Sequence, residues 1–254
     1  MRNRRRNAAR PDGRYYLAGG IAIAAIIGYL LVSPSFQGRG ETSTATTFTK
    51  TTQSTSGTTP SSKPIILYVN QGNGAVDGSN FAGLLDTANS HGFNTIFFQV
   101  YRSGTLLFTD SSLNQFVASS HGKGLKIFFA LYFTNSSQKI PASIYVDGED
   151  GINLDMSTLP IDAQTSLLDS LSSGYPGPTS ITTTNPSLAL HPSMLIVETY
   201  GAGNDQYIHH GIIASVGVFA TSSRQDYDQQ FQYALSNSDG VMVFDYAGLL
   251  KAGY

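Results

Sequence analysis

The sequence of 254 residues contains no cysteine and no tryptophan. Without cysteine the chain can form no disulfide bond, bind no metal through a thiolate and use no thiol as a nucleophile, and nothing follows about its redox compartment. Without tryptophan, any aromatic surface offered to a ligand has to come from tyrosine and phenylalanine, with fourteen residues of each.

Basic residues are scarce in the larger, C-terminal part of the chain. Six of the fifteen Lys and Arg residues lie within the first fourteen positions. From Pro64 onward, six basic residues stand against fifteen acidic ones, a formal charge of −9. Because a domain of this charge repels polyanions, we expect no nucleic-acid partner.

Residues 15–32 form a run without a charged side chain. As a helix these eighteen residues would span about 27 Å, enough for the hydrocarbon core of a bilayer. The basic residues 1–14 should stay in the cytoplasm, which predicts a transmembrane signal anchor with the rest of the chain outside the cell membrane. The alternative is a cleaved signal peptide, but the run is long for one and no small-x-small cleavage site precedes Ser33-Pro34.

Residues 33–63 contain seventeen Ser or Thr among 31 residues. Such a segment cannot bury a core, so we predict a disordered Ser/Thr-rich linker. The composition fits an O-glycosylated stalk and an unmodified linker equally well. Residues 64–254 then remain for one globular domain.

Within this domain, short apolar runs alternate with helical patterns. Strands are expected at 64–70, 95–101, 125–132, 151–155, 194–199, 215–220 and 241–246. Helices are expected at 81–89, 112–119, 161–172, 206–213 and 226–235, whereas the Pro- and Gly-rich residues 174–192 show no clear element. Seven β/α units predict an α/β fold with a parallel sheet, which this pattern leaves either open and doubly wound or closed into a barrel.

Three of the expected strands carry a carboxylate at their last or next-to-last position, namely Asp155, Glu198 and Asp245. In parallel α/β folds the carboxyl ends of the strands build the active site, so these are the candidate catalytic residues. The alternative is that they cap the following loops through backbone N–H groups. We expect no cofactor and no metal. The consecutive His209 and His210 would point about 100° apart on a helix, so they cannot both bind one metal ion.

Four separate segments resemble one protein family. They are His91–Gly104, Gly124–Ala130, Asp150–Pro160 and Asp239–Tyr246. They resemble the glycosyl-hydrolase-like TIM barrels of prokaryotic cell surfaces, whose fourth strand reads D-G-I-x-x-D-x-x-x-x-P and whose last strand reads G-V-M-V-W-D-Y. Phe244 stands where that family commonly has tryptophan. The resemblance implies a (β/α) TIM-like barrel, and the short domain predicts a seven-stranded or incomplete one.

The same resemblance implies roles for particular residues. Asp155 would be the principal functional carboxylate, Glu198 the general acid and Asp245 a substrate-binding or supporting residue. Apart from the resemblance, the position at strand ends predicts further sugar-binding residues: Asn70, Gln99, Tyr101, Arg102, Tyr132, Tyr200 and Tyr246. For Asn70 and Gln99 the alternative is a buried structural amide. Arg102 would bind a carboxylated sugar, hold a catalytic carboxylate, or close a salt bridge across the barrel mouth.

With this resemblance, the sequence predicts a membrane-anchored, extracellular glycoside hydrolase-like protein that acts on polysaccharide or cell-envelope glycan through its strand-end carboxylates. The alternative is a non-catalytic glycan-binding or envelope structural module on the same barrel.

Overall fold

The computed structural model of the chain describes residues 62–71, 76, 81–141, 144, 148–185, 192–200, 204–218 and 223–254. All of them belong to one compact unit, Thr59–Tyr254. The predicted segments 1–14 and 15–32, and all but the last two residues of the linker 33–63, lie outside the described residues. Among the residues that are described, no helix is both long and apolar enough to cross a membrane.

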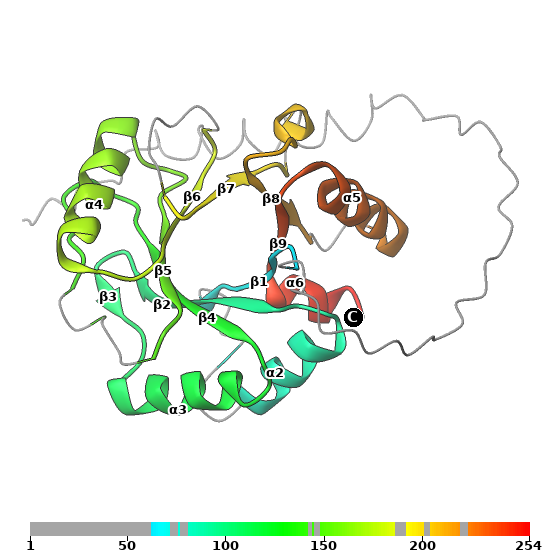
Figure 1. Cartoon of the computed structure of the whole chain (residues 1–254), viewed down its shortest axis with the longest axis horizontal. Helices are drawn as coiled ribbons and strands as arrows, with labels where there is room; N and C mark the ends of the chain where they lie inside the picture. Colours follow the sequence, from blue (N-terminus) through cyan, green and yellow to red (C-terminus); the bar gives the residue numbers. More distant parts are fainter. Residues whose placement is uncertain are drawn as a thin grey trace, which may run out of the picture. The chain divides into compact units, whose positions relative to one another are not determined.

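Eight parallel strands form a closed barrel (Figure 1). In chain order they are β1 (Ile65–Val69), β2 (Thr95–Arg102), β4 (Lys126–Tyr132), β5 (Gly151–Asp155), β6 (Thr179–Thr183), β7 (Met194–Glu198), β8 (Ile213–Gly217) and β9 (Gly240–Phe244). Each strand pairs with the next one, and β1 pairs with both β2 and β9, which closes the ring. The short β3 (Thr105–Leu106) is antiparallel to β2 and makes a hairpin with it.

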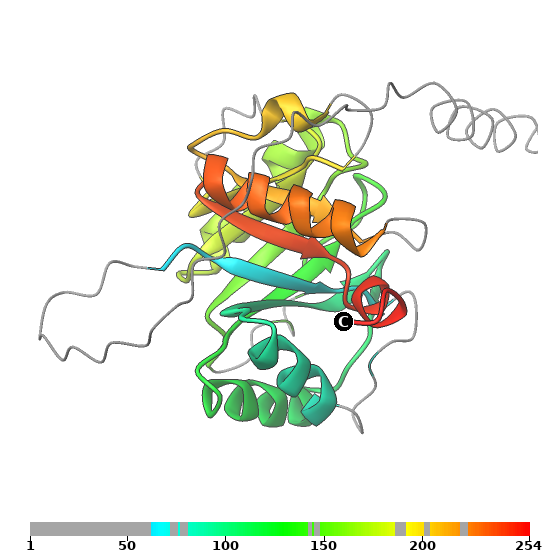
Figure 2. The same ribbon diagram turned by 90° about the vertical axis from the view of Figure 1, so that its right-hand side faces the viewer.

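Helices cover the outside of the ring (Figures 1 and 2). They are α2 (Phe81–Ser90), α3 (Asp110–His121), α4 (Ile161–Gly174), α5 (Arg224–Asn237) and α6 (Tyr246–Lys251). The helices predicted at 81–89, 112–119, 161–172 and 226–235 are confirmed. The helix predicted at 206–213 is wrong: a 3₁₀ turn (Asn204–Tyr207) is followed by Gly211 with φ 96°, and Ile213 already begins β8.

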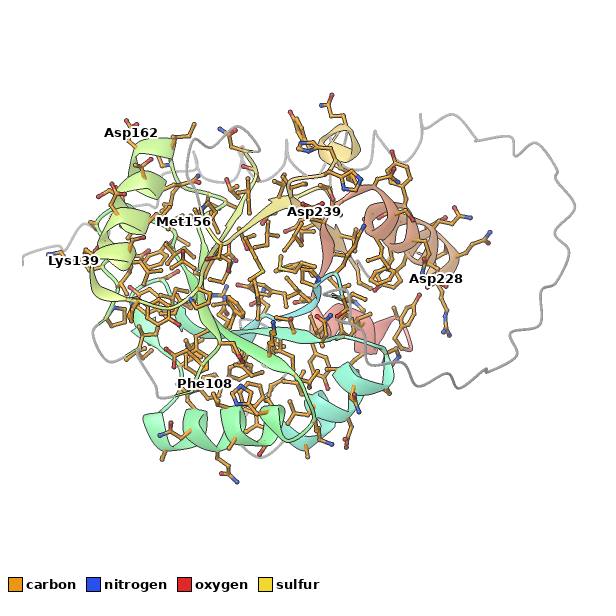
Figure 3. The ribbon with its side chains drawn as sticks, in the orientation of Figure 1. Phe108, Lys139, Met156, Asp162, Asp228 and Asp239 are labelled. Atoms are coloured by element: carbon orange, nitrogen blue, oxygen red, sulfur yellow. The ribbon has the colours of Figure 1, made fainter. Side chains whose placement is uncertain are left out.

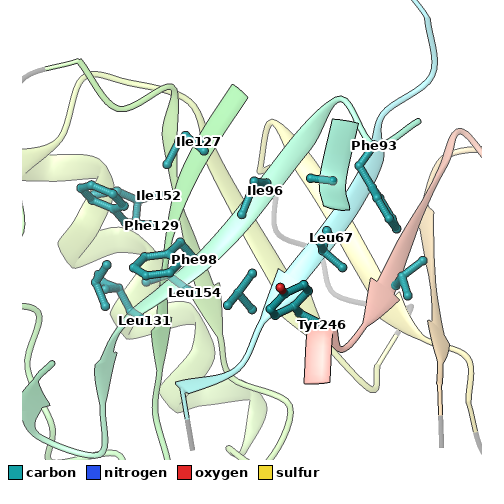
Figure 4. Close-up of a cluster of buried hydrophobic side chains, with 14 of the residues drawn as sticks. Leu67, Phe93, Ile96, Phe98, Ile127, Phe129, Leu131, Ile152, Leu154 and Tyr246 are labelled. Atoms are coloured by element: carbon teal, nitrogen blue, oxygen red, sulfur yellow. The ribbon is translucent and has the colours of Figure 1, made fainter. Parts of the chain in front are cut away.

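Two apolar layers hold the barrel together. The outer layer packs the outward faces of the strands against the helices, with Leu67, Ile96 and Phe98 among its fully buried members (Figure 4). The inner layer fills the amino-terminal half of the barrel with Ile66, Phe97, Phe128, Ile196, Ile213 and Met242. Figure 3 shows side chains filling the ring, so the barrel is a packed core and not a pore.

The polar half of the barrel lies toward the carboxyl ends of the strands. Two residues after Ile66 and Phe97, on the same inward faces, stand Tyr68 and Gln99. Side chains in a strand alternate between the two faces, so residues two apart both point into the barrel. The interior therefore changes from apolar to polar toward the carboxyl ends of the strands.

The expectation of a seven-stranded or incomplete barrel is wrong, because β6 is the eighth strand. It lies within residues 174–192, where the sequence showed no clear element. Its sequence is Thr-Ser-Ile-Thr-Thr, and its inward residues Ser180 and Thr182 accept hydrogen bonds from the buried Asn153 amide at 3.0 and 3.1 Å. The sequence analysis missed β6 because four of its five residues are Ser or Thr, so it forms no apolar run.

Candidate active site

A cavity of about 260 Å³ opens at the carboxyl ends of the strands. Six strands contribute a residue at or next to their ends: β1, β2, β4, β5, β7 and β9. The lining residues are Tyr68, Asn70, Gln99, Arg102, Tyr132, Asp155, Ser157, Glu198, Tyr200 and Phe244. Seven of these ten had been predicted as site residues, and the structure brings them into one pocket.

Asp155 ends β5 and is buried, with 5% of its surface exposed. The hydroxyl of Tyr68 donates a hydrogen bond to Asp155 Oδ2 at 2.8 Å, and Ser157 Oγ donates to Oδ1 at 3.4 Å. Burial and the nearby charge of Glu198 raise the pKa of Asp155 from 3.8 to about 7, and the hydrogen bonds from Tyr68 and Ser157 oppose this rise. The carboxyl group of Asp155 therefore changes charge near neutral pH.

Glu198 ends β7 and is only partly buried. Burial raises its pKa, while hydrogen bonds from Tyr200 and Ser157 lower it. Ser157 thus interacts with both carboxyl groups, and the charge of Glu198 raises the pKa of Asp155. Because burial and the charge of Glu198 both disfavour ionisation of Asp155, the pair keeps a proton up to about pH 7.

Behind Asp155 runs a chain of hydrogen bonds. The Gln99 side chain donates to the Tyr68 oxygen, and Gln99 Oε1 accepts from the backbone N–H of Gln71 at 3.0 Å. Burial, together with the charge of Asp155, raises the pKa of Tyr68 well above its usual value. Tyr68 therefore stays protonated and remains a donor toward Asp155.

Aromatic rings form part of the pocket wall. Tyr200 stacks on Phe244, with ring centroids 5.7 Å apart and planes at 21°. The ring of Tyr68 also contacts Phe244, with centroids 5.2 Å apart. Tyr132 lies beside the Arg102 guanidinium, 5.9 Å from its ring centroid. Flat apolar faces next to carboxyl and amide groups suit a ligand that carries both C–H and hydroxyl groups.

Two of the predicted sugar-binding residues lie elsewhere. The pairing of β2 with β4 shifts between Gln99 and Tyr101, so the alternation of side chains is interrupted there. Tyr101 consequently points outward, packs on Phe133 and donates to the Lys139 carbonyl oxygen, while Arg102 lines the pocket. Tyr246 belongs to the outer apolar layer, where α6 packs on the barrel (Figure 4).

Asp245 does not line the pocket. It is the N-cap of α6, and its Oδ1 accepts a hydrogen bond from the backbone N–H of Gly248 at 2.9 Å. This is the capping role that the sequence left as the alternative for strand-end carboxylates. Its charge still reaches the site, because it contributes to the raised pKa of Tyr200.

Three pocket residues had not been predicted: Tyr68, Ser157 and Phe244. A signal for Tyr68 and Ser157 was present, because each lies two residues from a predicted site residue and so on the same face of the extended chain. Among the described residues, no three His, Cys, Asp or Glu side chains come together as a group that would hold a metal ion.

No protein-family model matches the sequence, and no curated protein matches it. Solved structures with a similar fold include a glycoside hydrolase with a TM-score of 0.53 and 11% identity, covering 74% of this chain and 62% of that one. A second is a glycoside hydrolase family 5 protein from Bacteroides vulgatus, with a TM-score of 0.49 and 11% identity over 70% of this chain and 57% of that one. The first similarity shows that the protein has a glycoside-hydrolase-like barrel fold, and at such identity it shows the fold alone.

Proposed function

We propose that the protein is a glycoside hydrolase that acts on polysaccharide through Asp155 and Glu198. The observation that carries this proposal is the coupled pair of carboxyl groups in one pocket, whose pKa values are both raised. Glycoside hydrolysis commonly uses two carboxyl groups at the cleaved bond, one protonated and one ionised. A pair that holds one proton meets this requirement up to about pH 7.

The surroundings of the two groups support different roles. Both oxygens of Asp155 accept hydrogen bonds from hydroxyl groups, an arrangement that favours its ionised form. Glu198 is less buried, so its carboxyl group is the better placed to protonate the oxygen of a leaving sugar. We therefore assign the general acid to Glu198 and the ionised role, as nucleophile or base, to Asp155. Burial and the charge of Glu198 oppose this assignment, because both raise the pKa of Asp155.

The other pocket residues fit a sugar ring. Asn70 and Gln99 present amides for hydroxyl groups, and Tyr132, Tyr200 and Phe244 present ring surface. The cavity of about 260 Å³ is smaller than most ligand pockets, which favours an occupant of the size of a single sugar ring over a longer chain segment. The glycoside hydrolases of similar fold motivate the choice of substrate class.

The first experiment is hydrolysis of a polysaccharide panel by the purified full chain. Asp155→Asn and Glu198→Gln keep the shape of each side chain, and each should lower turnover by about 10²-fold to 10⁴-fold. Asp162→Asn, on the exposed side of α4, is the matched control and should retain full activity. Unchanged turnover in either pocket variant would remove that residue from the mechanism.

The division of roles has its own test. On a substrate with an activated aryl leaving group, loss of the general acid matters little, so Glu198→Gln should recover activity while Asp155→Asn should not. Added azide should restore turnover to Asp155→Ala, which leaves room for the anion, if Asp155 is the nucleophile. The opposite pattern would exchange the two roles.

A non-catalytic glycan-binding module is the second candidate. It is favoured by Asp155 itself, because both of its oxygens already bind protein hydroxyl groups. In that case no panel member would be hydrolysed, and the two pocket variants would bind glycan as the unaltered protein does.

Location is a further part of the proposal. Residues 15–32 would anchor the chain in the cell membrane, residues 1–14 would stay in the cytoplasm, and the barrel would lie outside beyond the linker. External protease should then release the barrel from intact cells. Protection of the barrel until the cells are broken would place it inside.

A further inference from the structure

Arg102 is the one cationic residue among the ten that line the pocket. We propose that it binds an anionic oxygen group on the sugar, a carboxylate or a sulfate, so that the substrate is an acidic polysaccharide. This inference rests on the proposed function for its site and adds the class of glycan.

Among the described residues, the Arg102 guanidinium has no anionic partner. In the described part of the chain the ion pairs are His121–Asp150, Lys123–Asp86 and His210–Asp239, and none involves Arg102. The guanidinium lies over the face of the Tyr132 ring. The sequence left two alternatives for Arg102: a salt bridge across the barrel mouth and an ion pair that holds a catalytic carboxylate. Neither occurs among the described residues.

The backbone holds Arg102 at this position from both sides. Arg102 pairs with Tyr132 of β4 on one side and with Thr105 of β3 on the other. The two residues between Arg102 and Thr105 have φ values of 49° and 98°, as in the tight two-residue hairpin turns with positive φ at both positions. In addition, the Ser103 backbone N–H donates to the Tyr132 carbonyl oxygen at 3.0 Å.

This anchoring follows a β-bulge that reverses the expected orientation. With unbroken alternation after Gln99, Tyr101 would face the pocket and Arg102 the helices. The shift in pairing turns Arg102 into the pocket instead. A planar guanidinium that is half-buried against an aromatic ring presents its N–H groups as a fork, the geometry that matches a carboxylate or a sulfate.

Charge balance in the pocket permits an anionic ligand. While the carboxyl pair holds one proton, the ten lining residues carry one carboxylate and one guanidinium, a net charge of zero. The domain as a whole carries −9, which disfavours an acidic polymer at long range. At physiological salt that repulsion is screened beyond about 8 Å, whereas a direct contact with Arg102 is much closer. The local attraction therefore outweighs the general repulsion.

Binding to paired polymers tests this inference. The acidic probes are polygalacturonate, alginate, hyaluronan and a sulfated galactan, and each neutral counterpart is made by reducing the carboxyl groups or removing the sulfate. Binding is measured with the full chain carrying Asp155→Asn, so that hydrolysis does not consume the polymer. Hydrolysis is measured separately with the unaltered chain.

We expect at least one acidic polymer to bind ten times or more tightly than its neutral counterpart. Adding Arg102→Gln should weaken that binding by about tenfold to a hundredfold, as expected for loss of a charge-assisted hydrogen-bond pair. The control Arg224→Gln removes an arginine from exposed α5, where it stacks on Tyr254, and should change nothing. The identity of the acidic polymer that binds shows whether Arg102 recognises a carboxylate or a sulfate.

Equal binding of acidic and neutral polymers, no binding of any acidic polymer, or full binding by Arg102→Gln would each overturn the inference. Acid-selective binding without hydrolysis in the unaltered chain would support this inference while defeating the proposed function. Hydrolysis of neutral glycans that does not depend on Arg102 would do the reverse.

Discussion

Tyr68 favours the ionised form of Asp155 through one hydrogen bond, against the larger effects of burial and of the Glu198 charge. Its hydroxyl lowers the pKa of Asp155, since it favours the ionised carboxylate. Tyr68→Phe should therefore raise that pKa above its value of about 7. Because this pKa marks the loss of the last proton held by the carboxyl pair, the alkaline limb of the pH profile of kcat/KM should move upward.

The matched control for this prediction is Tyr132→Phe. It removes a hydroxyl from the same pocket that has no hydrogen-bond partner among the described residues. The alkaline limb should stay in place in this variant. An alkaline limb that does not move in Tyr68→Phe either would mean that the limb reports another group.

Burial of Asp155 also makes the stability of the protein depend on pH. Its pKa rises from 3.8 to about 7 on folding, so the folded state favours the protonated form. The stabilisation is complete below about pH 4 and is lost as the pH rises through 7. A shift of this size corresponds to at most about 4 kcal/mol.

Asp155→Asn cannot ionise and should escape this loss. Relative to the unaltered protein, its free energy of unfolding in urea should improve between pH 4 and pH 8, by up to about 4 kcal/mol. The exposed Asp162→Asn should show no such trend. A difference that is the same at every pH would contradict the burial of an ionisable Asp155.

Gly151 gives β5 its close packing at the amino-terminal end of the barrel. A Cβ atom at this position would strike the ring of Phe128 and lie 2.6 Å from the Pro178 carbonyl oxygen. Gly151→Ala should therefore lower the free energy of unfolding by about 1–3 kcal/mol, the usual range for overpacking. Gly122→Ala is the control, because Gly122 lies in the helical region with φ −59° and a Cβ there meets only ordinary contacts.

The double variant Gly151→Ala, Phe128→Leu separates crowding from other causes. If the Phe128 ring is the obstacle, the smaller side chain should recover part of the loss in the same urea titration. If the two changes simply add, crowding by that ring is excluded.

Closure of the barrel depends on the last strand. β9 pairs with β8 on one side and with β1 on the other, and Val241, Met242 and Val243 are fully buried. Lys63, just before β1, also connects the start of the barrel to its end, because its Nζ donates to the Leu235 and Ser238 carbonyl oxygens at 2.9 and 2.7 Å. The two ends of the compact unit are therefore part of one cooperative structure.

Residues 59–254 should accordingly fold alone and unfold in a single thermal transition, followed by circular dichroism. A chain that ends at Asp239 should show no cooperative transition, because it leaves two strand edges and the apolar faces beside them open. Two separate transitions in residues 59–254, or a cooperative transition in the shortened chain, would contradict this account.

The sequence alone determined the elements that depend on local patterns. Buried runs such as Gly151–Asp155, and helical spacing such as that of Leu167, Leu168 and Leu171, locate strands and helices because neighbouring residues decide them. The same patterns placed Asp155 and Glu198 at strand ends, and their position in a shared pocket follows from the parallel order of the strands.

Only the tertiary structure decided the rest, because it depends on residues distant in the chain. Closure required β6, whose hydroxyl groups are satisfied by Asn153, 27 and 29 residues away. The bulge that exchanges Tyr101 and Arg102 exists only in the pairing of β2 with β4. The pKa of Asp155 depends on its burial, on Glu198 in the same pocket and on Tyr68, 87 residues away. Local sequence specifies which side chains are available, and packing decides which of them meet.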